Sequence, residues 1–325
     1  MTMQVLIAAN TNTPPPPAEQ VLDNVFWRGA AARMSICVPA YHYDVSALIA
    51  ALAECDDAGL VEVIVHDDGA GDHESLAHMQ YEASRQRIAV RLIAADANRG
   101  RAAARNAAIA HARADWVLLL DADMLPDDPQ FLTRYVEAIE TVGEPGVVVG
   151  GYSLQLTPKD TRSALHRWQA EVSECLSAAR RQVAPSRYVF SSNVLAHRDV
   201  VNTIPFDEGF SGWGWEDTDW GLRAAKVYPI RHIDNTATHL GLDTDKALMS
   251  KYAMSGENFA RLVQRHPAEA RTMPLFQMAQ RMRALPLRGT IRDVASWTAR
   301  TSALPVAVRG RALKAWRALV YAEAL

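Results

Sequence analysis

The sequence has few cysteines, no long apolar run and no surplus of basic residues. Of its 325 residues only three are cysteines, Cys37, Cys55 and Cys175. An odd number without metal-type spacing fits neither a disulfide framework nor a cysteine-based metal site, so a reducing compartment is expected. The formal net charge of −3 argues against a dedicated nucleic-acid-binding protein, which would carry a basic excess. We therefore predict no nucleic-acid partner.

The N-terminal residues lack an export signal. The apolar stretch at residues 5–9 is too short for a signal sequence or a membrane span, so a cytoplasmic location is predicted. Residues 14–17 are consecutive prolines, which cannot lie inside a helix or a central strand and predict an extended spacer. We expect an N-terminal tail, residues 1–33, and a folded body that begins near Met34.

From Met34 onward, strand and helix patterns alternate. Short apolar runs predict the strands, and amphipathic runs predict the helices between them. The strands are expected at residues 35–39, 61–65, 88–94 and 116–120, and the helices at 45–55, 74–85 and 101–112. This alternation predicts right-handed crossovers and an α/β fold, with a mostly parallel sheet flanked by helices.

Three of these strands are followed by polar residues. The segments are Pro39-Ala40-Tyr41, Asp67-Asp68-Gly69 and Asp121-Ala122-Asp123. Because ligands of an open parallel sheet bind beyond the carboxyl ends of its strands, we expect the three segments to form one site. The carboxylates of Asp121 and Asp123 suit a divalent cation, Mn²⁺ or Mg²⁺. Either acidic segment alone would more often be a simple turn, so the interpretation depends on the strand context.

The start of the helix at residues 101–112 suits an anion. Asn98 and Gly100 precede it, and Arg99, Arg101 and Arg105 place guanidinium groups around its N-terminus. Such an arrangement can bind phosphate oxygens, and we favour Arg105 for this role, with a solvated helix face as the alternative. The sequence contains no Gly-x-Gly-x-x-Gly or Walker loop, which argues against a dinucleotide-dependent dehydrogenase and a P-loop enzyme.

Residues 34 to about 150 resemble a GT-A glycosyltransferase of family 2. Val38-Pro39-Ala40-Tyr41 is similar to the first-strand motif of the family, and Asp67-Asp68-Gly69 to the turn that holds a uracil ring. Residues 98–106 resemble its Asn-x-Gly-x-x-x-Ala-Arg-Asn segment, and Asp121-Ala122-Asp123 its metal-binding Asp-x-Asp. The resemblance implies a UDP-sugar donor bound by these residues. The serine that usually follows the acidic turn is Ala70 here, so its hydroxyl contact is absent.

The second half carries a further resemblance. Gly212-Trp213-Gly214-Trp215-Glu216-Asp217 is similar to the Gly-Trp-Gly-Gly-Glu-Asp segment of galactosyltransferase-like and polymerising GT-A enzymes. This implies that Asp217 is the catalytic base and that Glu216 orients donor or acceptor hydroxyls. It also implies a metal-ligating histidine at His239. Trp215 replaces the last glycine of the motif, so the shape of the loop is expected to differ.

Several of these residues have structural alternatives. Trp213 and Trp215 lie between glycines and carboxylates and suit a sugar-stacking platform, with packing in the core as the alternative. A carboxylate such as Asp217 can accept the proton of an attacking hydroxyl, and a divalent cation can stabilise a departing diphosphate. Asp219 is expected to cap the helix that follows rather than to take part in catalysis.

The composition changes after His266. From Arg281 to the C-terminus, nine arginines and lysines stand against two acidic residues, interleaved with apolar side chains. Helices predicted at residues 291–301 and 306–322 would lay Trp297, Trp316 and Leu319 into an anionic membrane surface. The alternative is that these helices pack back on the catalytic domain. Membrane association would make the protein peripheral, on the inner face of the membrane.

The combined interpretation is a metal-dependent hexosyltransferase. Residues 34–150 would bind the nucleotide sugar, 151–265 the acceptor, and 266–325 would form a basic amphipathic helical tail. We expect transfer to a hydroxyl of a glycan or lipid-linked acceptor with inversion, although the same fold also supports retention. One alternative is a non-catalytic carbohydrate-binding protein. Another is a haloacid-dehalogenase-like phosphatase, whose motif expects threonine or valine where Leu125 stands.

Overall fold

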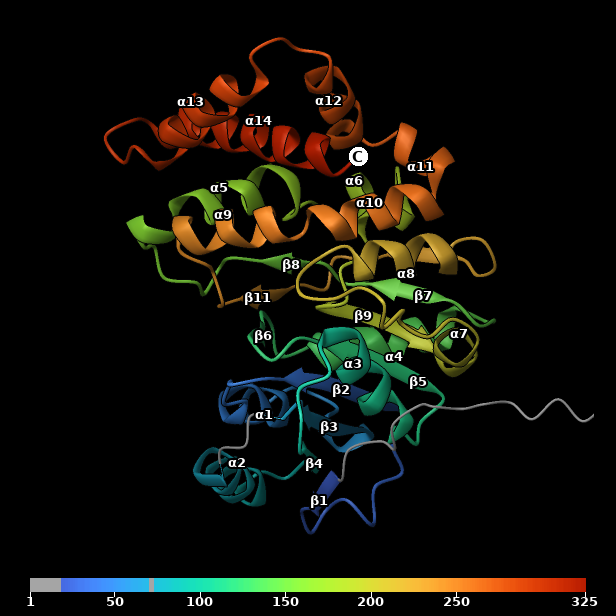
Figure 1. Cartoon of the computed structure of the whole chain (residues 1–325). Helices are drawn as coiled ribbons and strands as arrows, with labels where there is room; N and C mark the ends of the chain where they lie inside the picture. The colour runs from blue at the N-terminus through green and yellow to red at the C-terminus, as the bar shows by residue number, and fades with distance from the viewer. Residues whose placement is uncertain (1–18, 70–72) are drawn as a thin grey trace, which may run out of the picture.

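The computed structural model describes residues 19–69 and 73–325, so the prolines at 14–17 and Ala70 lie outside the described residues. Within these ranges an eight-stranded sheet forms the centre of the molecule, in the order β1-β4-β3-β2-β5-β9-β7-β10 (Figure 1). The strands are β1 (Glu19–Asp23), β2 (Met34–Ala40), β3 (Val61–Asp67), β4 (Ala89–Ala95), β5 (Trp116–Leu120), β7 (Val147–Val149), β9 (Asn193–His197) and β10 (Ile230–His232).

Strands β4, β3, β2 and β5 run parallel to one another, as the sequence predicted. Both β1 and β9 are antiparallel to their neighbours, and β7 and β10 are parallel to each other. Adjacent residues of β2 point to opposite faces, and both faces are apolar, so helices cover the sheet on both sides. The predicted α/β fold with a mostly parallel sheet is therefore confirmed.

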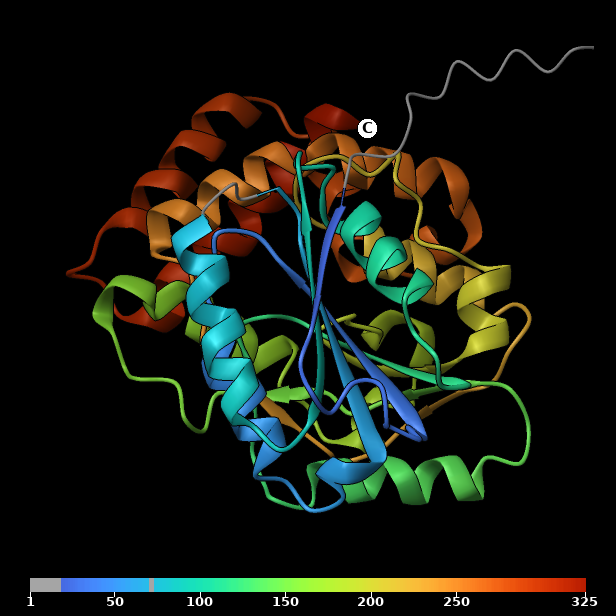
Figure 2. The ribbon, with the colours of Figure 1, turned by 90° about the horizontal axis from the view of Figure 1, so that it is seen from below.

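The helices between these strands divide between the two faces of the sheet. Helices α1 (Ser46–Ala53), α2 (His73–Arg85) and α4 (Phe131–Thr141) belong to one apolar core, and α3 (Arg101–Ala110) belongs to the other. Figure 2 shows α2 and α3 on opposite sides of the strands. Helices α1, α2 and α3 start and end close to their predicted ranges, because the apolar periodicity that predicted them also packs them on the sheet, whereas α4 was not predicted.

A second, three-stranded sheet has the order β6-β11-β8 within the described residues. Its strands are β6 (Met124–Pro126), β8 (Tyr152–Ser153) and β11 (Ala237–His239). The pair β6 and β11 is antiparallel, with His239 opposite Met124. This register brings His239 beside Asp123, which directly precedes β6. Pairing of strands thus joins two residues that are far apart in the sequence.

The second half of the chain adds a layer of helices above the two sheets (Figure 1). Its helices are α5 (Ala164–Ser173), α6 (Ala178–Arg181), α7 (Arg198–Thr203), α8 (Glu216–Ala224), α9 (Asp245–Met254), α10 (Gly256–Arg265), α11 (Pro267–Arg271), α12 (Pro274–Arg283), α13 (Arg288–Arg300) and α14 (Val306–Ala324). Short 3-10 turns occur at Ala58–Leu60, Thr161–Ser163 and Pro185–Tyr188. In the part of the chain that the structure describes, no helix has the length and apolar character needed to cross a bilayer.

The C-terminal helix α14 packs against the rest of the protein. Its Trp316 and Leu319, expected in a membrane surface, are buried, and Trp316 shares an apolar core with Leu165 of α5 and Tyr252 of α9. For these two side chains the alternative, packing on the catalytic domain, is therefore correct. Trp297 of α13 differs, because its side chain is exposed.

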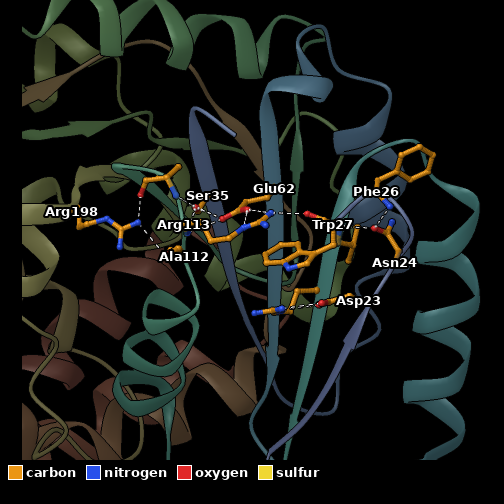
Figure 3. A network of polar contacts seen from close by, with 12 residues as sticks. Asp23, Asn24, Phe26, Trp27, Ser35, Glu62, Ala112, Arg113 and Arg198 are labelled. Carbon is orange, nitrogen blue, oxygen red and sulfur yellow. Dashed lines mark hydrogen bonds and ion pairs between the residues drawn. The ribbon is translucent and has the colours of Figure 1, made fainter. Parts of the chain in front are cut away.

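The folded body begins earlier than Met34. Strand β1 pairs with β4 along its whole length, and Trp27 is buried between two guanidinium groups, with Arg91 4.4 Å and Arg113 4.0 Å from its ring centroid. Arg113 also bonds to the buried carboxylate of Glu62, and Figure 3 shows this network. Residues 19–33 are therefore an ordered edge of the sheet, which corrects the predicted boundary.

Candidate active site

A cavity of about 600 Å³ opens at the carboxyl ends of β2 and β5. Such a volume suits a ligand of the size of a nucleotide. Twelve of the residues expected at the site line it, namely Pro39, Tyr41, Asp68, Asn98, Gly100, Asp121, Ala122, Asp123, Trp213, Glu216, Asp217 and His239. Three other expected residues, Asp67, Arg105 and Trp215, are not among the residues that line it.

Asp123 and His239 form the part of the cavity that could hold a metal. The Nε2 atom of His239 lies 3.0 Å from Oδ2 of Asp123. Burial alone would lower the pKa of His239, but the hydrogen bond and charge of Asp123 outweigh burial and raise it. Gly241 leaves room for this carboxylate, because a Cβ there would lie 1.9 Å from Oδ2 of Asp123.

These two residues fit a cation that also takes ligands from a substrate. Among residues 19–69 and 73–325, no group of three or more histidine, cysteine, aspartate or glutamate side chains could hold a metal ion. Divalent cations prefer oxygen ligands and commonly complete their coordination with phosphate oxygens and water. Asp123 and His239 would thus supply the protein's part of a site that a diphosphate completes.

Arg105 holds two carboxylates together behind the cavity wall. Its guanidinium is completely buried, with Nη2 2.9 Å from Oδ1 of Asp121 and Nη1 3.2 Å from Oε1 of Glu216. Burial would raise the pKa of Asp121, but the charges of Arg105 and Arg101 outweigh it and lower that pKa. Arg105 is buried and already paired and does not line the cavity, so the geometry gives no support to its predicted contact with phosphate. Its position shows instead that it fixes Asp121 and Glu216.

Arg101 is the guanidinium that reaches the cavity. It stands in the first turn of α3, lines the cavity and has a side chain that is 41% exposed. Its Nη2 lies 3.1 Å from Oδ2 of Asp121 and its Nε lies 3.6 Å from Oε1 of Glu216. The free amides at the N-terminus of α3 add a partial positive charge beside it. A phosphate would therefore meet Arg101 at this end of the helix.

The acidic turn shapes the loop before α3. Asp68 accepts hydrogen bonds from the backbone N–H of Arg99 at 3.1 Å and of Gly100 at 2.8 Å. Gly69 has φ of +80°, and a Cβ there would lie 2.3 Å from the carbonyl carbon of Ala97. Only glycine fits this close approach of two backbones. Asp68 thus lies at the cavity and also positions the residues that precede Arg101.

Helix α8 contributes a second pair of carboxylates, Glu216 and Asp217, whose surroundings differ. Glu216 is buried and paired with Arg105 and Arg101. Asp217 lines the cavity and accepts hydrogen bonds from the Ser191 hydroxyl at 3.2 Å and its N–H at 3.3 Å. Burial, together with the charge of Glu216, raises the pKa of Asp217 to about 6. Asp217 is therefore the carboxylate placed to accept a proton near neutral pH.

The two tryptophans before α8 lie in different places. Trp213 lines the cavity, and Nζ of Lys251 lies 5.9 Å from its ring centroid. Trp215 points away, with its ring centroid 4.8 Å from that of Phe259 and 5.9 Å from that of Tyr321 in α14. A sugar could stack on Trp213 but not on Trp215, whose side chain belongs to the packing between α8, α10 and α14.

Asp219 does not cap α8. The residue in the cap position is Trp215, and Asp219 lies inside the helix. Its buried carboxylate is 2.7 Å from Nε of Arg223 and 2.9 Å from Nε2 of His266. The prediction failed because α8 starts four residues earlier than predicted. Asp219 therefore lies inside the helix, and its side chain faces the layer of helices.

Several cavity residues carry no motif and were not predicted from the sequence. They come from strand β8, helices α5 and α9 and the loops of the second half, and they are Tyr152, His166, Glu174, Asp243 and Lys251. The ring centroid of His166 lies 5.8 Å from that of His239, so this group adjoins the metal pair. Lys251 is paired with Asp243 at 2.7 Å. These residues line the cavity together with Pro39 and Tyr41.

Comparisons with known proteins show the family and the fold of the chain. A family model described as glycosyl transferase family 2 matches residues 35–202. A curated hyaluronan synthase from Pasteurella multocida is 29% identical over 193 residues, which cover 50% of this chain and 19% of the synthase. The chain therefore matches about a fifth of the length of that relative.

Solved structures share the fold at low sequence identity. The mannosyltransferase PcManGT from Pyrobaculum calidifontis, in complex with GDP-Man and Mn²⁺, superposes with a TM-score of 0.56 and 15% identity, covering 89% of this chain and 85% of that chain. The fragment TarS 1-349 of S. aureus gives a TM-score of 0.48 and 16% identity, covering 88% and 89% of the two chains.

Proposed function

Because the chain belongs to glycosyl transferase family 2 and has the GT-A fold, we propose that it transfers one hexose from a nucleoside-diphosphate donor to an acceptor hydroxyl. The observation that carries this proposal is the single cavity in which Asp123, His239, Arg101 and Asp217 meet. These side chains combine a metal pair, a phosphate ligand and a base. The family membership leaves no support for the phosphatase alternative.

The donor would lie across the carboxyl ends of β2, β3 and β5. Pro39, Tyr41 and Asp68 line the end of the cavity where a nucleoside would bind, and Arg101 lies where its phosphates would reach. A uracil base is the proposed specificity, by resemblance of the acidic turn to that of family members. PcManGT, which shares the fold, was solved in complex with GDP-Man and Mn²⁺, a nucleotide sugar and a divalent cation.

Asp217 would act as the base in a direct displacement. The acceptor oxygen forms a bond to the anomeric carbon while the bond from that carbon to the diphosphate oxygen breaks. The proton of the acceptor hydroxyl passes to Asp217, and the nucleoside diphosphate leaves with the electrons of the broken bond. Attack from the face opposite the leaving group inverts the anomeric centre. Ser191 orients the carboxylate through two hydrogen bonds.

A divalent cation, Mn²⁺ or Mg²⁺, would be held by Asp123 and His239. When bound, it would stabilise the negative charge of the departing diphosphate. Arg101 would add a further positive charge for the phosphates to contact. Arg105 keeps Asp121 and Glu216 in place, so neither carboxylate swings into the space that the phosphates need.

The acceptor would enter from the side formed by residues 151–265. Trp213 offers an apolar ring face for a sugar, and Lys251, Asp243 and Glu174 line the same cavity. An aromatic face beside polar groups is a common way to bind a glycan. The proposed acceptor is a hydroxyl of a glycan or of a lipid-linked sugar.

A screen of nucleotide sugars tests this function. Release of nucleoside diphosphate would be followed with and without MnCl₂, using membrane lipid extract or oligosaccharides as acceptors, for wild type, Asp123→Ala and Asp217→Asn. Asp115→Asn is the matched control, because Asp115 is exposed and does not line the cavity. We expect one donor to be used, metal-dependent release, and loss of release in the first two variants only.

Two results would contradict the proposal. If no nucleotide sugar is turned over with any acceptor but one still binds, the protein is a carbohydrate-binding member of the family. If Asp217→Asn keeps the wild-type rate while Asp123→Ala loses it, the base is a different residue and the displacement described here is wrong.

A further inference from the structure

Helix α13 and the turn before it carry an exposed apolar surface, called here the α13 surface. It consists of Leu285, Leu287, Ile291, Val294 and Trp297, whose exposed fractions lie between 38% and 77%. Scattered apolar side chains on a protein surface need no explanation, but a contiguous set of large ones marks an interaction site. These five lie within thirteen consecutive residues.

The α13 surface is one face of a docked helix. Leu287, Ile291, Val294 and Trp297 follow one another at intervals of three or four residues, so their side chains share one side of the helix. Ala295 and Ala299 are buried, and Ala299 joins the apolar core that contains Leu313 and Trp316 of α14. The helix is thus already packed on its small residues, and its large apolar residues are directed outward.

Unpaired arginines surround this surface. Arg281 and Arg283 lie at the end of α12, and Arg288 and Arg300 at the two ends of α13. All four are exposed, and none has an ion-pair partner within residues 19–69 and 73–325. The segment 281–311 contains seven arginines and one aspartate, and although Arg292 pairs with Glu323 and Arg309 with Asp245, the remaining arginines leave an excess of positive charge here, whereas the whole chain has a net charge of −3. The positive charge is therefore concentrated at one end of the molecule.

From these observations we propose that the α13 surface docks on an anionic lipid bilayer. Trp297 and the aliphatic side chains enter the boundary between headgroups and acyl chains, as apolar faces of interfacial helices do. The arginines extend their charged ends to the lipid phosphates, each adding to the attraction. Helices α12 and α13 lie in the outermost layer in Figure 1, away from the two sheets.

A second copy of the chain is a poorer occupant of the same surface. A twofold dimer places the same patch of both copies face to face, so four arginines of one copy would meet four of the other. Like charges at that distance repel. A bilayer with anionic lipids supplies both the apolar medium and the opposite charge. The proposal goes beyond the transfer reaction and does not depend on it.

Vesicle binding by the full chain tests the proposal. Co-sedimentation would be measured with vesicles of phosphatidylcholine alone and of phosphatidylcholine mixed with phosphatidylglycerol. Val294→Asp and Trp297→Ser change the α13 surface, and Arg283→Glu with Arg288→Glu reverses two of its charges. Val227→Asp is the matched control, because Val227 is 64% exposed and Val294 58%. Thermal denaturation of every variant shows whether the fold is kept.

We expect binding to the anionic vesicles only, weakened by added NaCl because salt screens charge. Val294→Asp and Trp297→Ser should each lower the partition coefficient about tenfold, from the loss of buried apolar area. The double charge reversal should abolish binding, and Val227→Asp should bind like wild type. Equal binding to neutral vesicles, or wild-type binding by Val294→Asp, would overturn the proposal. So would a wild-type dimer in light scattering that Val294→Asp converts to a monomer, which would assign the surface to a second copy.

Discussion

Replacing Arg105 and Arg101 separately with methionine distinguishes a structural guanidinium from a ligand-binding one. The two arginines stand four residues apart on α3 and both contact Asp121, yet Arg105 is completely buried and Arg101 is 41% exposed. Methionine removes the charge and keeps most of the volume. The same substitution at both positions therefore compares their surroundings directly.

The buried position should control stability. Without Arg105, the carboxylates of Glu216 and Asp121 lose a fully buried partner, and breaking such a pair costs about 3–5 kcal/mol. A loss of this size would lower the melting temperature by about 10 °C in a domain of this length. Arg101 is partly exposed, so its pairs with the same carboxylates contribute less than about 1 kcal/mol.

The exposed position should control donor binding. A hydrogen bond to a charged phosphate contributes about 1.5–3 kcal/mol, so Arg101→Met should weaken donor binding by at least about tenfold. Thermal denaturation and calorimetric titration of nucleoside diphosphate would be measured for both variants. Arg105→Met with wild-type stability and lost affinity for diphosphate would refute this reasoning, because it would make Arg105 the phosphate ligand.

Four further predictions follow from the site and the fold. The pKa of Asp217 is raised to about 6, so its carboxylate is deprotonated and able to act as a base above that pH. In a pH profile, kcat/KM should therefore fall tenfold per pH unit below about 6. A profile that begins to fall only near pH 4 would contradict the assignment of Asp217 as the base. Asp217→Asn should lower kcat by about 10²–10⁴ with unchanged donor affinity in calorimetry, and lost affinity would point to donor binding instead. Gly241→Ala should weaken Mn²⁺ binding in titration calorimetry, because the added Cβ would collide with Oδ2 of Asp123. The control is Gly59→Ala, which should bind Mn²⁺ like wild type because the space around Gly59 is open. Trp27→Ala should lower the free energy of unfolding by about 3–5 kcal/mol in urea titration, and an unchanged midpoint would show that residues 19–33 contribute nothing to the fold.

The first half of the fold could be predicted because its signals are local. The strands β2, β3, β4 and β5 are short apolar runs, each followed by a polar segment, and the helices between them have apolar residues at helical spacing. Nothing outside these runs is needed to recognise them. The polar segments then fall at one edge of the sheet, because parallel strands all end there.

Strand β1 could not be predicted in this way. Its sequence, Glu19–Asp23, has only two apolar residues, and most of the strand is exposed. It becomes a strand by pairing with β4, whose register is a long-range property. Edge strands often carry polar residues, which protect the sheet from pairing with other chains, and the same polarity hides them in a sequence.

The roles of charged residues in the site depended on packing rather than on motifs. The motif at residues 98–106 contains three arginines, and only the three-dimensional structure shows that Arg105 faces Glu216, which lies 111 residues later in the sequence. In the same way, the pairing of β6 with β11 brings His239 to Asp123, 116 residues apart. A motif identifies which residue types are present, whereas the partner of each charge is decided by distant segments.

The C-terminal helix explains why a tryptophan can stand at position 215, where the related motif has a glycine. Trp215 has φ of +78°, a left-handed conformation that suits the glycine of the related motif and costs a larger residue about 1–2 kcal/mol. Its ring contacts Phe259 and Tyr321, and the guanidinium of Arg317 lies 5.4 Å from its centroid. Burial of an indole side chain among aromatic rings contributes more than this cost. Because Arg317 and Tyr321 belong to α14, the helix that compensates the strain also fixes the residue directly before Glu216 and Asp217. The C-terminal helix α14 is thus a structural part of the loop that precedes Glu216 and Asp217.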